Sequence, residues 1–178
     1  MYQTILTFWF EEIKPGQWWK KDPQFDQLVA RRFLALHQQA ERAELAAWRR
    51  TIEGRLAEIL VLDQFSRNIW RDTARAFAND AMALVLAQEA VAAGLDQQLP
   101  PVQRSFLYMP YMHSESPVIH EQAVRLFTAL GQQDSLDYEL KHQQIIERFG
   151  RYPHRNAILG RPSTAEELAF LQEPGSSF

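Results

Sequence analysis

Cysteine is missing from this sequence. Its absence excludes disulfides, zinc sites built on thiolates and cysteine nucleophiles, and it fits a reducing cytoplasm. An excess of one charge is missing too, because 19 basic and 22 acidic residues leave a formal net charge of -3. This balance provides no general attraction to nucleic acid or to an anionic membrane, so a nucleic-acid partner is not expected. The remaining chemistry is that of oxygen and imidazole groups.

Long apolar runs and leader segments are also missing. The richest apolar stretch, Leu56 to Leu62, is interrupted by Glu58 and followed by Asp63. It falls well short of the roughly 18 residues that a membrane span needs. The apolar start of the chain carries no basic leader and no small-residue cleavage pattern. We therefore expect a cytoplasmic protein without a membrane segment.

The common catalytic motifs are absent as well. The chain contains no HExxH, no P-loop, no GxGxxG and no GxSxG, which are the patterns typical of metalloproteases, nucleotide-binding folds and serine hydrolases. We predict no metal site, and the sequence indicates no cofactor. Whether the protein is an enzyme is therefore left open by its motifs.

What the sequence does contain indicates a helical protein. Its 178 residues are 46% hydrophobic and 23% charged, which is enough for one domain with a substantial core. Alternation of polar and apolar residues is too short to predict strands. We expect a single helical domain over residues 1–178, with a loose tail at 174–178.

Capping signals divide the chain into helices. Asp22 before Pro23 predicts a helix start, and Gly131 predicts a helix end. Thr164 with Glu167 predicts a capping box. The expected helices are a short aromatic one near residues 5–10 and others that open at Pro23, near Leu56, at Asn79 or Asp80, at Pro101 (kinked or ended near Pro110), at Pro117, at Asp134 or Ser135, and at Thr164. Short loops in the second half predict antiparallel helical hairpins.

A first polar cluster lies on the helix that begins near Leu56. Asp63 falls on the apolar stripe of that helix, so we expect it to be buried. A buried carboxylate needs a partner, and Arg67 lies one turn along, with Arg71 one turn further. Asn68 belongs to the same segment. The cluster is interpreted either as a structural ion pair or as part of a ligand site.

A second polar cluster follows the helix that ends at Gly150. Four arginines and one histidine, with no acid, lie between residues 148 and 161. The planar fork of arginine suits carboxylate or phosphate ligands, although basic residues at a helix C-terminus also favour its dipole and cap its carbonyls. The candidate binding residues here are Arg148, Arg151, His154, Arg155 and Asn156.

Two further imidazoles are candidates. His142 lies with Tyr138 on the apolar stripe of its helix, so its ring is expected to face inward. His113 and Glu115 lie in a loop between helices. If folding brings His113 and Glu115 near His142 or His154, two roles are open to them. They could ligate a divalent metal, or they could act as a general base and the group that orients it. The spacing does not require this arrangement.

Several blocks of the sequence resemble those of one known family. They are Phe8 to Phe10 with Trp18 and Trp19, Leu62 to Asn68, Tyr108 to Pro110 with His113 to Glu115, and Arg148 to Asn156. The chain resembles, over nearly its whole length, the largely bacterial proteins catalogued as domain of unknown function 924. The resemblance implies the helical fold of the tetratricopeptide-like superfamily, and it implies that both arginine-rich blocks belong to the family pattern. It implies no catalytic residues.

Two classes of function are compatible with these patterns. In the first, the arginine-rich blocks converge on a concave face and form a pocket for a small anionic ligand, a phosphate or a carboxylate. The alternative is a non-catalytic tetratricopeptide-like scaffold that binds a protein or peptide, with the arginine clusters as internal ion pairs. Arginines that line an open cleft favour the pocket, and arginines held by acids favour the scaffold.

If the two arginine-rich blocks converge, two specific contacts are expected. Asp63 should accept a charge-assisted hydrogen bond from an arginine or histidine of the block at residues 148–156. Three basic side chains of that block should lie beside Arg67 and Asn68, and they are Arg151, His154 and Arg155.

Overall fold

The computed structural model describes residues 1–178 and consists of helices without strands. The all-helical class is thus confirmed. The chain forms two compact units, which we call unit 1 (Met1–Arg71 and Arg75–Pro110) and unit 2 (Asp72–Ala74 and Tyr111–Phe178). The single domain stays a prediction. None of the helices combines the length and the apolar character that a membrane crossing requires.

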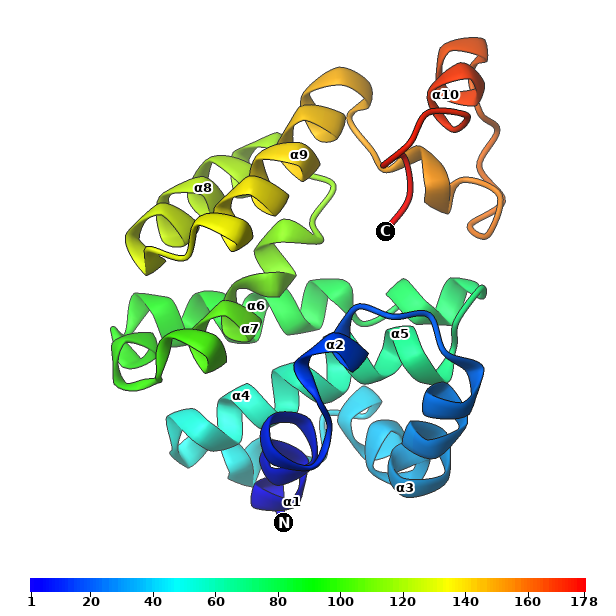
Figure 1. The fold of residues 1–178 in the computed structure, drawn as a ribbon. Helices are drawn as coiled ribbons and strands as arrows, with labels where there is room; N and C mark the ends of the chain where they lie inside the picture. The colour runs from blue at the N-terminus through cyan, green and yellow to red at the C-terminus, as the bar shows by residue number, and fades with distance from the viewer. The chain divides into compact units, whose positions relative to one another are not determined.

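Unit 1 is built from helices of very different lengths (Figure 1). They are α1 (Tyr2–Thr7), α2 (Pro15–Trp18), α3 (Pro23–Glu41), α4 (Ile52–Leu60), α5 (Ser66–Ile69), α6 (Asp80–Ala92) and the first part of α7 (Pro101–Met112). Short 3-10 turns lie at η2 (Ala46–Arg50), η4 (Ala74–Phe77) and η5 (Leu95–Gln98), and π-helical turns at η1 (Phe8–Glu12) and η3 (Val61–Phe65). The predicted start of α3 is confirmed, because the Asp22 carboxylate accepts the backbone N–H groups of Gln24 and Phe25.

An aromatic core holds the two π-helical turns of unit 1 in place. Phe8 and Trp9 of η1 lie 6.0 and 5.6 Å, between ring centroids, from Phe65 of η3. Phe33 of α3 lies 4.9 Å from Phe8 and 5.0 Å from Phe65. Such aromatic pairs contribute roughly 0.5–1.5 kcal/mol each beyond the area they bury. The core therefore fixes η3, the turn that carries Asp63.

Unit 2 contains one long helical hairpin and a C-terminal subregion. Its elements are α8 (Pro117–Leu130), α9 (Gln133–Phe149), η6 (Pro153–Arg155) and α10 (Ala165–Phe170). α8 and α9 lie side by side (Figure 1), joined only by Gly131 and Gln132. Gly131 ends α8 with φ +76°, a left-handed conformation that glycine adopts without a steric penalty. The predicted Thr164–Glu167 capping box is confirmed, with both of its hydrogen bonds present.

The predicted end of a helix near Pro110 is confirmed, because α7 ends at Met112, two residues after this proline. Two other local expectations differ from the structure. α9 begins at Gln133 and not after a cap at Asp134 or Ser135. Tyr138, expected on the apolar stripe, is 60% exposed.

The looseness expected of the tail at 174–178 stays a prediction, and two residues of the tail make contacts in the structure. Ser176 is buried and its hydroxyl donates to the carbonyl of Leu171 at 3.2 Å. The ring of Phe178 packs against His142 with 3.9 Å between centroids. The polar composition of this segment did not indicate the contact between rings.

Candidate functional site

Asp63 lies on the π-helical turn η3 and is 1% exposed, which confirms the predicted burial. The side-chain amide of Gln64 donates to its Oδ2 at 2.7 Å. Arg67 Nη1 lies 3.2 Å from its Oδ1 and donates to its backbone carbonyl at 3.0 Å. π-Helical turns are frequent at functional sites. Here the turn places two consecutive polar side chains in contact inside the core, with the predicted arginine as partner.

Arg67 also holds a second carboxylate. Its Nη1 and Nη2 donate to the two carboxylate oxygens of Asp80, at the start of α6, at 2.8 and 3.0 Å. Both side chains are mostly buried. Arg67 is therefore shared between Asp63 and Asp80, and it ties η3 and α5 to α6.

Arg71, which the spacing placed one turn beyond Arg67, pairs with Asp26 in the first turn of α3. Its Nε and Nη2 donate to the two oxygens of Asp26 at 2.5 and 2.8 Å. Asn68 donates to the same carboxylate at 2.8 Å. Asp26 and Asp80 were missed as partners, although a carboxylate in the first turn of a helix is itself a signal, since the helix dipole favours it there.

Sequence reasoning also missed a buried serine and histidine in unit 1. His37 Nε2 lies 2.7 Å from Ser66 Oγ, and its Nδ1 lies 3.6 Å from a carboxylate oxygen of Glu41. Burial lowers the pKa of His37 below its usual value. The order of groups is that of a hydrolytic triad, but the Ser66 hydroxyl donates to the Leu62 carbonyl at 2.6 Å and the serine is fully buried. A nucleophile needs access to substrate, so we interpret this network as packing.

In unit 2, the capping-box residue Glu167 is also the acceptor for Arg151. Arg151 Nε and Nη2 donate to its two carboxylate oxygens at 2.7 and 2.8 Å. Asn156 and the backbone N–H of Thr164 donate to the same carboxylate, at 3.2 and 2.8 Å. The hydrogen bond from Arg151 lowers the pKa of Glu167 to about 2. Two of the candidate binding residues thus anchor α10 to the loop after α9.

Glu115 forms the second such centre in unit 2. Arg161 Nη1 and Nη2 donate to its two carboxylate oxygens at 2.8 and 2.9 Å, and the backbone N–H of Tyr152 donates at 2.8 Å. Burial raises the pKa of Glu115, but these hydrogen bonds outweigh it, and the pKa lies below its usual value. Arg148 donates to Glu166 at 3.0 Å in an exposed pair.

A buried imidazole–carboxylate pair joins α8 to α9. His120 Nδ1 lies 2.6 Å from Glu139 Oε1, and its Nε2 donates to the Ser114 carbonyl at 2.7 Å. The other oxygen of Glu139 is buried without a hydrogen-bond partner. Burial raises the pKa of Glu139, with His120 opposing the shift. Neither residue was among the predicted site residues. The signal that could have found them is a polar residue on the inner face of each helix of a hairpin.

The remaining candidates surround Tyr152. His142 faces inward as predicted and its Nδ1 donates to the Tyr138 carbonyl at 2.7 Å. Burial lowers the pKa of His142 to about 3. The Arg155 guanidinium lies 4.7 Å from the centroid of the Tyr152 ring and donates to the backbone carbonyl of His113 at 3.0 Å. His113 thus takes part in this contact through its carbonyl and not its ring.

Most of the candidate residues therefore lie around a few carboxylates and one tyrosine. In unit 1 they surround Asp63 and Asp26, and in unit 2 they surround Glu167, Glu115 and Tyr152. No group of three or more histidine, aspartate or glutamate side chains is arranged to hold a metal ion. The convergence of the two arginine-rich blocks stays a prediction.

A family model described as "Bacterial protein of unknown function (DUF924)" matches residues 5–175. The chain belongs to the DUF924 family. The solved structure titled "Structure of Protein of Unknown Function ATU0120 from Agrobacterium tumefaciens" is 40% identical to it, with a TM-score of 0.91 over 96% of each chain. A search of curated proteins finds no match. The predicted membership is confirmed, and both arginine-rich blocks lie within the residues that the DUF924 model matches.

Proposed function

We propose that this DUF924 protein is a non-catalytic helical scaffold that binds a protein or peptide, and that its arginine-rich clusters are internal ion pairs. One observation carries the proposal: arginines of both clusters donate two hydrogen bonds to a carboxylate of the same unit. These pairs are Arg67 with Asp80, Arg71 with Asp26, Arg151 with Glu167, and Arg161 with Glu115.

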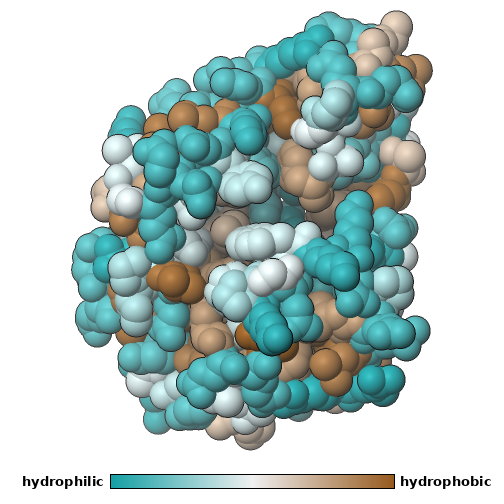
Figure 2. Space-filling view, viewed as in Figure 1, coloured by the Kyte–Doolittle hydropathy of each residue, from teal (hydrophilic) through white to brown (hydrophobic).

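The geometry of these pairs makes them poor anion receptors. A two-pronged arginine–carboxylate pair is among the strongest of charge-assisted hydrogen bonds. A phosphate or carboxylate ligand would have to displace the protein carboxylate and leave it unpaired in a partly buried position, at a considerable desolvation cost. The face of the molecule in Figure 2 is largely hydrophilic, with scattered hydrophobic groups.

The proposal includes the arrangement of the helices as hairpins in a tetratricopeptide-like right-handed superhelix. The α8–α9 hairpin supports it, since two long helices joined by two residues pack against each other within unit 2. Stacked hairpins of this kind bind partners on their extended faces.

The rival function is a pocket for a small anionic ligand, in which the two arginine-rich blocks converge. It predicts that phosphate or a phosphorylated or carboxylated metabolite stabilises the folded protein through Arg155, because a ligand of the native state raises the melting temperature by mass action. The scaffold proposal predicts no such specific stabilisation.

A thermal-shift experiment distinguishes the two. Wild type, Arg155→Ala and Arg148→Ala are melted in sulfate, phosphate and chloride at equal ionic strength, and with a panel of phosphorylated and carboxylated metabolites. Arg148 forms an exposed pair, so its variant controls for the loss of one positive charge, and salting-out by sulfate affects all three proteins alike. We expect the three proteins to respond equally. A larger anion effect in wild type and Arg148→Ala than in Arg155→Ala would overturn the proposal.

A further inference from the structure

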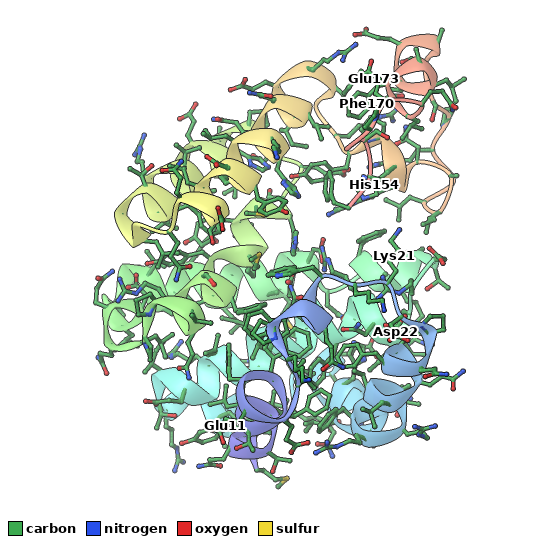
Figure 3. The ribbon with its side chains drawn as sticks, viewed as in Figure 1. Glu11, Lys21, Asp22, His154, Phe170 and Glu173 are labelled. Atoms are coloured by element: carbon green, nitrogen blue, oxygen red, sulfur yellow. The ribbon has the colours of Figure 1, made fainter.

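The tail of the chain places an aromatic ring among three others. After α10 it runs back toward the segment that carries His154 (Figures 1 and 3). The ring of Phe178 lies 3.9 Å from that of His142, 4.5 Å from that of His154 and 5.2 Å from that of Tyr152, measured between centroids. We call these three rings the aromatic cage.

Two walls of the aromatic cage, His142 and Tyr152, are held by hydrogen bonds that do not involve the tail. His142 donates through Nδ1 to the Tyr138 carbonyl within α9. The hydroxyl of Tyr152 donates to the Met112 carbonyl at 2.5 Å and lies 3.1 Å from His120 Nε2. His142 and Tyr152 are buried. The loss of the occupant would therefore not remove the hydrogen bonds that hold these two walls.

The occupant, by contrast, is held weakly. Phe178 is 46% exposed even though it touches three rings. The hydrogen bonds of its segment are local, from Ser176 to the carbonyls of Leu171 and Glu173. No helix includes residues 171–178. The ring of Phe178 is half exposed and belongs to an irregular segment. We therefore expect that it can leave the cage.

We infer that the aromatic cage is a docking site for the phenylalanine of an extended partner peptide, and that Phe178 fills this site in cis until a partner displaces it. The inference rests on the proposed function, since it names the partner of the scaffold. The seated segment itself indicates the chemistry of that partner, which is a short irregular peptide with proline, glycine and serine before a phenylalanine. Ring contacts supply the affinity, because aromatic pairs contribute beyond their buried area.

The test uses the full chain and the tail sequence as a peptide in trans. The probe is a fluorescent peptide with the sequence of residues 173–178, amidated at its end, and the control peptide replaces its phenylalanine with alanine. The proteins are wild type, Phe178→Ala, and Leu168→Ala, which removes an exposed apolar side chain of α10 outside the cage. Binding is measured by fluorescence anisotropy, and the ring signals of His142 and His154 are followed by NMR.

We expect Phe178→Ala to bind the probe more tightly than wild type and Leu168→Ala do. A tethered ring competes at an effective concentration on the order of millimolar, so a probe with a Kd of about 100 µM is weakened about ten-fold when Phe178 is present. The His142 and His154 signals should shift with the probe and not with the alanine peptide. If Phe178→Ala is not folded, Phe178→Leu, which keeps apolar bulk without the ring, takes its place.

Two outcomes overturn the inference. In one, folded Phe178→Ala binds neither peptide. In the other, wild type and Phe178→Ala bind the probe equally. Neither outcome bears on the anion experiment, which tests the scaffold proposal separately.

Discussion

The two units bury charge in different ways. In unit 1 the buried or half-buried carboxylates Asp63, Asp26 and Glu58 face arginines, which keep their charge at all ordinary pH values. Unit 2 also uses arginine–carboxylate pairs, but it holds four of the five histidines of the chain, and the rings of His120 and His142 are buried. Unit 1 buries His37 alone.

This difference separates two sources of stability. A buried arginine–carboxylate pair depends on both partners being present, because removal of one leaves the other charged and desolvated. A buried neutral histidine depends on pH, because the unfolded chain takes up a proton that the folded chain resists. We therefore expect unit 1 to be sensitive to the loss of single acids, and unit 2 to be sensitive to acidification.

The largest expected effect comes from Asp63→Ala in unit 1. The substitution leaves the Gln64 amide without its acceptor and leaves Arg67 with one carboxylate in place of two. We expect a loss of roughly 3 kcal/mol or more in the free energy of unfolding, measured by urea denaturation at neutral pH. Asp63→Asn keeps the size of the side chain but not its charge. Its free energy of unfolding should lie between those of Asp63→Ala and wild type. A loss below about 0.5 kcal/mol for Asp63→Ala would show that the carboxylate is not a buried partner.

A smaller effect, specific to unit 2, comes from acidification through His142. Its pKa is about 3 in the folded chain, below the value of about 6.5 for an ordinary histidine. The stability that the neutral ring provides is fully present above pH 6.5 and is lost as the pH falls toward 3. The slope for one proton is roughly 1.4 kcal/mol per pH unit, so stability should fall by about 2 kcal/mol between pH 6.5 and pH 5.

The matched variant for this prediction is His142→Gln, which does not titrate and keeps an amide donor for the Tyr138 carbonyl. The free energy of unfolding is measured by urea denaturation at intervals from pH 7.5 to pH 4.5. It should fall less steeply with pH in the variant than in wild type, because the variant takes up about one proton fewer on unfolding. His37 of unit 1, whose pKa is also lowered by burial, contributes equally to both proteins and cancels. Identical slopes for the two proteins would mean that His142 titrates normally.

Much of the fold could be predicted from local chemistry. Asp22, Gly131 and the Thr164–Glu167 pair mark helix ends through hydrogen bonds within a few residues, so a single sequence reveals them. The burial of Asp63 could be predicted as well, since its position follows from helical periodicity. The end of α7 near Pro110 follows from local chemistry too, since proline lacks the backbone N–H that continues a helix.

The partners in the candidate site could not be predicted in the same way. Arg71 meets Asp26 across 45 positions of sequence, and Arg161 meets Glu115 across 46. Such pairs depend on how helices pack, which periodicity does not specify. The contact of Phe178 with His142 is of the same kind. Sequence patterns therefore located the arginine-rich clusters of this DUF924 protein, but they did not predict which carboxylates pair with those arginines.

The smallest expected effect is that of Glu166→Gln in unit 2. Glu166 pairs with Arg148 at the surface, where both side chains are about half exposed or more. Exposed pairs are screened by water and salt, and they contribute roughly 0–1 kcal/mol. The Arg148 guanidinium also lies 4.7 Å from the ring centroid of Phe149, and this contact does not need the carboxylate. We expect a change below about 0.5 kcal/mol in urea denaturation, and a smaller one in 1 M salt. A loss as large as that of Asp63→Ala would mean that exposure does not decide the strength of these arginine–carboxylate pairs.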